Sequence, residues 1–384
     1  MPRMDALAWL QSLSKFGIRP GLERMEVLLT ALGEPQHAFA AIHVVGTNGK
    51  STTTRMTESL LLAAGLSVGS TVSPHVRGWS ERIQVNGAEA DIAAAVAAVR
   101  PAAEAAGATQ FEVLVAAAFL AFAEAGVDIA VIEAGLGGRW DATNVVGASV
   151  VVLTNVALDH TDLLGDTREL IAAEKLAVIR PGATVIVGEA EWAAAAHAYG
   201  AATVTIGDGT RPIELATLAA EAHLGRAVDP AAARAVRLPG RAEWRSAAPA
   251  ELWDGAHNAA GVRFLLAQLA AGRDAAGRDL AGAPAAGFTL CTSILADKGV
   301  DEMLDLLAGV APTVVATSSS SPRALPADEL ARHCAGRFPL VEAVAAPAAA
   351  LARARELAGP RGAVLVTGSL YLLADLAAAQ EHAA

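Results

Sequence analysis

The stretch that decides the fold is His43-Val-Val-Gly46-Thr47-Asn48-Gly49-Lys50-Ser51-Thr52-Thr53. It lies between a β-branched run and an amphipathic segment, which predicts a strand over 42–45 and a helix over 51–64 joined by a glycine-rich loop. Small residues let backbone N–H groups approach phosphate oxygens, and a helix N-terminus favours negative charge. Lys50 adds a cation, and the hydroxyl of Ser51 or Thr52 can reach Mg²⁺. The stretch therefore predicts a phosphate-binding site at a strand end.

The loop departs from the eight-residue pattern of many phosphate-binding loops, because Val44 stands where that pattern has its first glycine. Taken alone, Gly49-Lys50-Ser51 also fits an ordinary turn at the start of a helix. The predicted strand before it and the predicted helix after it favour phosphate binding over an ordinary turn.

Short apolar runs alternate with longer helical patterns along the chain. The runs lie at 42–45, 127–133, 149–154, 184–187, 251–254, 289–294, 313–317 and 363–367. Their continuous apolar character predicts α/β structure with mostly parallel strands covered on both faces. Breaker residues at Leu238-Pro239-Gly240-Arg241 predict a boundary. We expect a P-loop-type domain over 1–238 and a smaller, Rossmann-like α/β domain over 239–384.

The composition excludes several classes of protein. Of the 384 residues, 53% are hydrophobic and 4% aromatic, so the cores must be mainly aliphatic. The net charge of −11 argues against broad nucleic-acid binding, which needs clustered cations. No stretch reads as a membrane span, and residues 1–5 lack the start of a secretory signal, which predicts a cytoplasmic protein. Cys291 and Cys334 are expected to be reduced, structural thiols.

Motifs along nearly the whole chain narrow the interpretation. They are Phe16-Gly-Ile-Arg-Pro-Gly-Leu-Glu-Arg-Met25, Gly46-Thr-Asn-Gly-Lys50, Ser73-Pro-His-Val76, Glu81-Arg-Ile-Gln-Val-Asn-Gly87, Thr109-Gln-Phe-Glu112, Glu133-Ala-Gly-Leu-Gly-Gly-Arg-Trp-Asp-Ala-Thr-Asn144, Asp159-His-Thr-Asp-Leu-Leu-Gly165, Glu174-Lys175, Pro239-Gly-Arg241, Asp254-Gly-Ala-His-Asn258 and Thr367-Gly-Ser-Leu-Tyr371. In order and spacing they resemble folylpolyglutamate synthase/dihydrofolate synthase of the Mur ligase superfamily.

The resemblance implies an ATP- and Mg²⁺-dependent amide ligase. ATP would phosphorylate an acid, dihydropteroate or tetrahydrofolate or both, and the amino group of L-glutamate would attack the acyl phosphate. The implied partners are these small molecules, with no membrane or nucleic acid, and the implied state is a monomer. Because phosphoryl transfer to a carboxylate gathers negative oxygens, cations and fixed donors must stabilise it. The residues implied to bind ATP are Gly46, Thr47, Asn48, Gly49, Lys50, Ser51, Thr52, Arg241 and Asp254.

The resemblance also implies a metal site. Ser73, Glu133 and His160 would ligate one Mg²⁺, and Glu133 would serve a second together with Ser51 or Thr52. Glu133 and His160 both follow predicted strands, where doubly wound sheets hold ligands. Structural readings stay open: a solvated carboxylate for Glu133, a loop or capping histidine for His160, and a turn cap for Ser73. Imidazole is moreover an unusual ligand for Mg²⁺.

Further residues receive roles from the same resemblance. Lys50, Glu133, His160, Lys175 and His257 would be catalytic, with Lys175 carbamylated to an anion near the metal. An unmodified lysine remains the alternative. In the second domain, Arg241, Asp254 and His257 would help to place glutamate, whereas a linker salt bridge is the alternative for Arg241 and Asp254. The residues implied to contact the substrates are Thr109, Phe111, Glu112 and Ser369; a simple turn is the alternative for Ser369.

Three departures from the family pattern leave the substrate open. Ser51 follows Lys50 where the family usually has glycine, and the region 189–239 is short. Trp79, Trp140 and Trp253 stand where relatives commonly have smaller or aliphatic residues. Two alternatives therefore remain: a ligase of the same superfamily that acts on another acid or amino acid, and a non-catalytic nucleotide-binding paralogue.

Overall fold

The structure, a computed structural model, describes residues 3–13, 21–280, 284 and 287–381. Contacts within the chain divide it into two compact units. Unit 1 comprises Met1–Pro74 and Trp79–Val236, and unit 2 comprises His75–Gly78 and Arg237–Ala384. The division falls two residues before the boundary expected from the sequence. It also assigns the four residues 75–78 to the unit that the C-terminal part forms.

Unit 1 is built on one eight-stranded sheet in the order β4-β3-β2-β5-β1-β6-β7-β8. The strands are β1 Ala40–Val45, β2 Val68–Thr71, β3 Ile83–Val85, β4 Ala88–Glu89, β5 Ile129–Glu133, β6 Val150–Leu153, β7 Thr184–Val187 and β8 Thr203–Ile206. All neighbouring strands pair in parallel except β2 with β3 and β3 with β4. Since β1 pairs with both β5 and β6, the loops after these three strands leave the sheet side by side.

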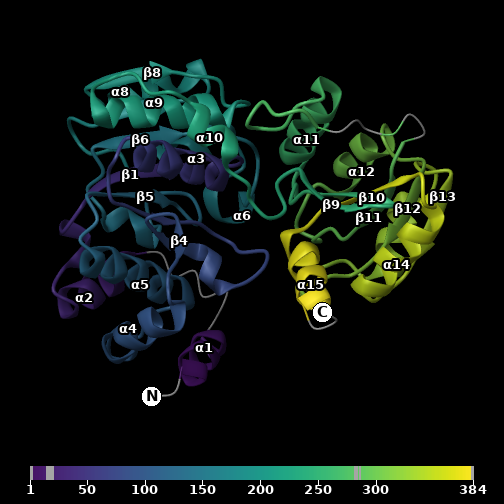
Figure 1. The fold of residues 1–384 in the computed structure, drawn as a ribbon, viewed down its shortest axis with the longest axis horizontal. Coiled ribbons are helices and arrows are strands. Elements are labelled where there is room, and N and C mark those ends of the chain that lie inside the picture. The colour runs from purple at the N-terminus through teal and green to yellow at the C-terminus, as the bar shows by residue number, and fades with distance from the viewer. Residues whose placement is uncertain (1–2, 14–20, 281–283, 285–286, 382–384) are drawn as a thin grey trace. The chain divides into compact units, whose positions relative to one another are not determined.

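Helices cover both faces of this sheet (Figure 1). They are α1 Arg3–Ser12, α2 Glu23–Ala31, α3 Lys50–Ala63, α4 Ile92–Ala106, α5 Gln110–Ala125, α6 Thr161–Leu164, α7 Arg168–Leu176, α8 Ala193–Ala198, α9 Pro212–Leu224 and α10 Ala231–Ala235, with 3₁₀ turns at Pro35–His37, Trp79–Arg82, Ala142–Val145 and Ala190–Trp192. Helices α3, α9 and α10 pack together on one face, and α4 and α5 lie on the other. The expected doubly covered parallel sheet is confirmed.

Unit 2 contains a six-stranded sheet in the order β13-β12-β11-β14-β10-β9. Its elements are β9 Glu243–Ala247, β10 Ala250–Trp253, α11 Ala259–Ala271, β11 Thr289–Thr292, α12 Val300–Ala308, β12 Thr313–Ala316, α13 Ala327–Cys334, β13 Leu340–Ala343, α14 Pro347–Ala358, β14 Ala363–Thr367 and α15 Leu370–Glu381. Only β9 is antiparallel to its neighbour. Helices α14 and α15 cover one face, and α11 and α12 lie on the other (Figure 1). The second α/β domain is thereby confirmed.

Trp253 belongs to the core of unit 2. Its side chain is completely buried, its Nε1 donates to Glu251 Oε2 at 3.0 Å, and the Arg245 guanidinium lies 4.1 Å from the ring centroid. Packing therefore accounts for this tryptophan, which carries no information about the substrate. Trp140, by contrast, is 52% exposed.

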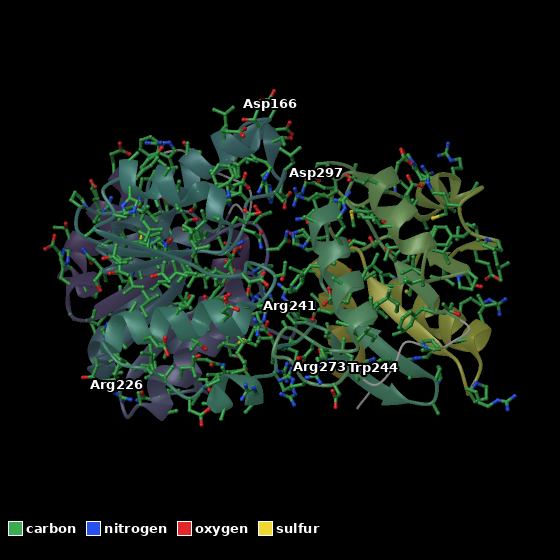
Figure 2. All side chains as sticks on the ribbon, turned by 90° about the horizontal axis from the view of Figure 1, so that it is seen from above. Asp166, Arg226, Arg241, Trp244, Arg273 and Asp297 are labelled. Carbon is green, nitrogen blue, oxygen red and sulfur yellow. The ribbon has the colours of Figure 1, made fainter. Side chains whose placement is uncertain are left out.

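Charged side chains lie on the surface, and both cysteines are buried as free thiols. Charged side chains lie around the outside of unit 1, as Asp166 and Arg226 do (Figure 2). Cys291 and Cys334 are free and buried, and burial raises the pKa of each thiol to about 12, so both are protonated and unreactive. Within the described residues, no helix combines the length and the apolar character needed to cross a membrane.

Candidate active site

The phosphate loop, Gly46–Gly49, connects β1 to α3. Two of its glycines are required by the backbone: Gly46 has φ +147° and Gly49 has φ +82°. A Cβ on Gly46 would also collide with the Thr154 hydroxyl. Gly49 occupies the N-cap of α3 without a side-chain cap. The first turn of α3 therefore presents N–H groups of the kind that bind anions.

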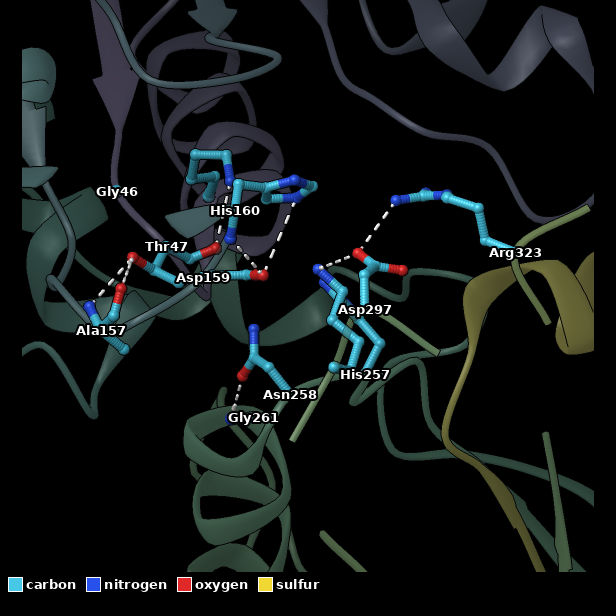
Figure 3. A network of polar contacts seen from close by, with 12 residues as sticks. Gly46, Thr47, Ala157, Asp159, His160, His257, Asn258, Gly261, Asp297 and Arg323 are labelled. Atoms are coloured by element: carbon cyan, nitrogen blue, oxygen red, sulfur yellow. Dashed lines mark hydrogen bonds and ion pairs between the residues drawn. The ribbon is translucent and has the colours of Figure 1, made fainter. Parts of the chain in front are cut away.

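The segment that follows β6 holds the phosphate loop in place. Thr47 N donates to Asn155 O at 2.9 Å, and Asn48 N donates to Asn155 Oδ1 at 3.0 Å. The Thr154 hydroxyl donates to Asn48 O at 2.7 Å. On the other side, Ala157 N donates to Thr47 Oγ1 at 3.0 Å (Figure 3). The loop is thus preorganised by hydrogen bonds from a neighbouring strand end, so little ordering remains when an anion binds.

Two lysines lie against the phosphate loop. Lys50 Nζ donates to Thr47 O at 3.2 Å, and Lys175 Nζ donates to Gly46 O at 2.8 Å. Lys175 is only 3% exposed. Burial, with a smaller contribution from the nearby Lys50 charge, lowers the pKa of Lys175 to about 7. Its amine therefore loses the proton close to neutral pH, where an exposed lysine stays charged.

Glu133 is hydrogen-bonded to two other predicted metal ligands, Ser51 and Ser73. It ends β5 and is 3% exposed. Its Oε1 accepts from the Ser51 hydroxyl at 3.0 Å, and its Oε2 accepts from Ser73 N at 3.0 Å. The structure therefore brings Ser51, Ser73 and Glu133 together beside the phosphate loop. A carboxylate next to the Ser51 hydroxyl offers hard oxygen donors of the kind that Mg²⁺ prefers, so Glu133 and Ser51 fit the expected ion.

His160 lies on the segment between β6 and α6, with a left-handed φ of +50°. Its backbone N donates to Asp159 Oδ1 at 2.9 Å, and its Nε2 lies 3.9 Å from the same oxygen (Figure 3). The described part of the chain contains no group of three His, Cys, Asp or Glu side chains able to hold a metal. A metal ion beside Glu133 would therefore need hydroxyl groups and phosphate oxygens as further ligands.

The Glu133 loop, Glu133–Asn144, fixes the end of α7 and with it Lys175. A Cβ on Gly138 would lie 2.7 Å from Glu174 O and 2.8 Å from Lys175 O, so only glycine lets the helix approach this closely. Arg139 reinforces the contact, because its N donates to Glu174 O and its Nε to Glu174 Oε1, each at 2.9 Å. The motif glycine and arginine thus position Lys175 from outside the phosphate loop.

Two of the residues expected to bind the acid, Thr109 and Glu112, already form hydrogen bonds within the protein. Thr109 and Glu112 form a capping box at the start of α5, and Glu112 Oε1 also accepts from Arg24 Nη2 at 3.0 Å. Phe111 packs directly on Gly135 of the Glu133 loop. Local structure therefore explains Thr109 and Glu112, whereas Phe111 remains partly exposed. In the N-terminal motif, residues 16–20 lie outside the described residues.

In unit 2, Asp254 closes the loop after β10. Its Oδ2 accepts from Ala242 N and its Oδ1 from Ala256 N, both at 2.9 Å. Burial raises the pKa of Asp254, and the Arg241 charge opposes this shift. His257 Nδ1 lies 2.8 Å from Gly255 O, which requires a proton on Nδ1. Asp254 and His257 thus lie in the turn that follows β10, and Arg241, on the segment before β9, reaches Gly255 of that turn.

Ser369 begins α15, where its buried hydroxyl accepts from Tyr371 N at 3.1 Å. The neighbouring strand ends carry further buried hydroxyl groups, those of Thr292, Ser293, Thr317 and Thr367. Hydroxyl groups therefore predominate at the ends of β11, β12 and β14 in unit 2. In the adjoining turn, Asp297 pairs with Arg323 at 3.1 Å (Figure 3).

Sequence reasoning missed two residues that shape the site. Asn155 holds the phosphate loop, and Asp141 accepts from Leu136 N at 2.7 Å within the Glu133 loop. A signal existed for both, because Asn155 directly follows the predicted strand 149–154 and Asp141 lies inside a quoted motif. Their side chains act on the backbone, and such roles are invisible until the loops are folded.

Comparison with known proteins identifies the family. Residues 44–226 match the Mur ligase middle domain, and residues 240–370 match the Mur ligase, glutamate ligase domain. A dihydrofolate synthase/folylpolyglutamate synthase of Mycobacterium tuberculosis is 34% identical over 393 residues, covering 84% of this chain and 79% of that protein. This chain belongs to the folylpolyglutamate synthase/dihydrofolate synthase family. Members of the family are ATP-dependent ligases.

Other members of the family support the assignment. A dihydrofolate synthase/folylpolyglutamate synthase of Bacillus subtilis is 42% identical over 192 residues, which cover 47% of this chain and 45% of that protein. The structure of E. coli FolC in complex with DHPP and ADP superposes with a TM-score of 0.87 at 30% identity, covering 100% of this chain and 98% of that chain. The family resemblance of the motifs and the α/β fold expected from the apolar runs are therefore confirmed.

Proposed function

We propose that this chain uses ATP and Mg²⁺ to join L-glutamate to dihydropteroate, to the γ-carboxyl group of tetrahydrofolate, or to both. The observation that carries the proposal is the Glu133 carboxylate, held by Ser51 and Ser73 beside a preorganised phosphate loop. Related structures support the ligands, since E. coli FolC binds DHPP and ADP, and a bifunctional relative binds Mn, AMPPNP and L-glutamate.

The residues of unit 1 would act on the phosphates. The backbone of Gly46–Thr52 and the Lys50 ammonium would hold the nucleotide, because fixed N–H groups and a cation stabilise phosphate oxygens. Mg²⁺ would be held by Glu133 with Ser51 or Thr52, and a second ion by Glu133, Ser73 and His160. A bound Mg²⁺ neutralises the charge that develops as the γ-phosphoryl group moves to the acid.

We further propose that Lys175 is carbamylated. Carbamylation requires a neutral amine, which attacks CO₂ through its lone pair and loses one proton as the carbamate forms. Support comes from the buried position of Lys175 and from its pKa of about 7. The product is an anion placed beside the carbonyl of Gly46 and near Lys50. ¹³C NMR of protein equilibrated with ¹³CO₂ tests this, because a carbamate resonance should appear in the wild type and be absent from Lys175→Met.

Residues 239–384 would form the glutamate-ligase domain, and residues 1–238 the ATP-binding domain. Arg241 and Asp254 would contact the nucleotide, and His257 and Ser369 would help to place glutamate. Thr109, Phe111 and Glu112 would lie along the acid. The free, buried thiols of Cys291 and Cys334 suit a reducing cytoplasm, and we propose that the enzyme works there as a monomer.

One assay tests the proposed function against its alternatives. Purified protein is incubated with ATP, Mg²⁺ and L-glutamate together with dihydropteroate or tetrahydrofolate, while phosphate release and the mass of the product are followed. A product heavier by one glutamyl residue supports the proposal. Phosphate release only with another acid or amino acid would assign a different ligase. Nucleotide binding without turnover on any acid would favour the non-catalytic paralogue.

A further inference from the structure

His43 is a fully buried, polar residue in the middle of β1, three residues before the phosphate loop. On the sheet it lies between Ile132 of β5 and Val151 of β6. Its Nε2 lies 2.8 Å from the Thr143 hydroxyl, and among the described residues its Nδ1 has no hydrogen-bond partner. A buried polar side chain inside an aliphatic sheet is costly, so this position calls for a specific reason.

The hydrogen-bond donors can be assigned along a short chain of three residues. The Thr143 hydroxyl donates its single proton to Asp141 Oδ1, so its oxygen is left to accept from His43 Nε2. His43 is therefore protonated on Nε2 and unprotonated on Nδ1. This neutral tautomer agrees with burial, which together with the charge of Arg180 lowers the pKa of His43 to about 3.

Asp141 connects the hydrogen bonds of His43 and Thr143 to the rest of the Glu133 loop. Besides the Thr143 hydroxyl, it accepts from Leu136 N at 2.7 Å and Thr143 N at 3.1 Å. One carboxylate thus ties together both ends of the loop between residues 136 and 143. The same loop starts at Glu133 and docks α7 through Gly138, which positions Lys175 against Gly46 O.

We propose that His43 is a positioning residue that holds the Glu133 loop in register with the phosphate loop through Thr143 and Asp141. The inference rests on the proposed function, because it concerns the placement of Glu133 and Lys175 for phosphoryl transfer. The neutral imidazole donates one fixed hydrogen bond and touches no reacting atom. β1 leads into the phosphate loop and His43 binds the Glu133 loop, so one side chain links both halves of the phosphate site.

A set of three substitutions tests the hydrogen bond apart from the volume of the ring. In His43→Gln the amide nitrogen lies as many bonds from Cα as Nε2 does, so it can still donate to Thr143. In His43→Asn the amide reaches only the place of Nδ1, and in His43→Leu the donor is absent. We expect kcat to fall about 10- to 100-fold in the Leu and Asn variants, as for other partners that orient ligands, and to recover mostly in the Gln variant.

The partner residue provides the matched control. Thr143→Val removes the hydroxyl, and Thr143→Ser keeps it, so only the Val variant should lose activity. Because His43 and Thr143 act in one chain, the double variant His43→Leu with Thr143→Val should lose no more than either single variant. The affinity for ATP, measured by calorimetry, should change less than threefold, since the phosphate loop keeps its bonds to residues 154–157.

Two readouts separate failure of this inference from failure of the proposed function. ¹⁵N NMR of the wild type should show His43 as the neutral tautomer protonated on Nε2 from pH 5 to pH 8, whether or not the protein turns over. A tautomer protonated on Nδ1 would overturn the inference. So would equal kcat values for the Gln and Leu variants, or full activity in a His43→Leu variant whose thermal unfolding matches the wild type.

Discussion

The two sheet edges that carry the candidate residues differ in chemistry although the two units share one architecture. In unit 1, two ionisable residues lie buried near the phosphate loop: Lys175 on α7 and Glu133 at the end of β5 are each 3% exposed. In unit 2, hydroxyl groups predominate at the ends of β11, β12 and β14, and the buried carboxylate of Asp254, after β10, accepts from two backbone N–H groups. The same kind of fold therefore places buried ionisable residues beside the phosphate loop in one unit and mainly hydroxyl groups at the strand ends of the other.

This difference suits the two kinds of substrate that the proposed reaction requires. A nucleotide triphosphate and a metal ion need groups whose charge interacts strongly, and burial strengthens such interactions. L-Glutamate carries two carboxylates and an ammonium group, so it also needs hydrogen-bond donors and acceptors at fixed positions, to which hydroxyl groups such as that of Ser369 can contribute. The division of labour between the units can be tested by substitutions on each side.

The largest effect is expected at Glu133. Glu133→Ala and the neutral isostere Glu133→Gln should each lower phosphoryl transfer by about 10³-fold or more, because the charge that holds the metal is lost. Phosphate release measures this, while circular dichroism and thermal unfolding check the fold. Retained turnover in Glu133→Gln would remove the metal role of this carboxylate and break the contrast between the two edges.

The pH dependence of stability tests whether burial lowers the pKa of Lys175. In the wild type the pKa of Lys175 is lowered from 10.5 to about 7, so between these values the unfolded chain binds more protons. The free energy of unfolding should therefore rise with pH relative to Lys175→Met, by at most about 1.4 kcal/mol per pH unit, and level off below pH 7. Denaturant unfolding at pH 6, 7, 8 and 9 in CO₂-free buffer measures it. A constant difference across this range would contradict the lowered pKa.

Substitution of Asp254 should lower stability more than substitution of Glu133 does, because two backbone N–H groups donate to its carboxylate. It should also weaken the nucleotide contact that we propose for Asp254. Asp254→Asn keeps one acceptor and places an amide NH₂ group against the other backbone N–H, which should cost about 1–3 kcal/mol of unfolding free energy. Urea unfolding measures the cost, and the matched comparison is Glu133→Gln, for which activity should suffer far more than stability. If Asp254→Asn abolished turnover without destabilising the chain, the second edge would be as electrostatic as the first.

The smallest effect is expected at Ser369. Ser369→Ala removes the hydroxyl that accepts from Tyr371 N, which should lower the unfolding free energy by about 1 kcal/mol. If the hydroxyl also contacts the amino acid, KM for L-glutamate should rise several-fold while KM for ATP stays unchanged. Ser369→Thr, which keeps the hydroxyl, is the control. Equal changes in both KM values would place its role in folding alone.

Strands and helices marked by a clear hydrophobic pattern agree with their predicted positions. The strand over 184–187 matches β7, and the helix over 51–64 matches α3 within one residue. The short, partly exposed edge strands β8 and β13 were missed, because half-exposed runs such as 203–206 lack a continuous apolar signal.

The candidate site was predictable wherever a residue acts at a strand end. Glu133 and the phosphate loop fall where the α/β rule places them. The capping box at Thr109 and Glu112 was not recognised, although the spacing Thr-x-x-Glu before an apolar run predicts one. The role of His43 depends on a hydrogen bond across 100 residues of sequence. No local pattern encodes such a contact.

Gly138 has an evolutionary consequence. The residue carries no chemistry, yet a single methyl group there would strike the carbonyl groups of Glu174 and Lys175. Replacing Gly138 would therefore disturb Lys175 indirectly, because the helix that carries Lys175 would have to move and its amine would be displaced. Such a change could be tolerated only if α7 moved outward, and that movement would separate Lys175 from the phosphate loop. The freedom of this position to vary is therefore set by a helix that lies about thirty residues further along the chain.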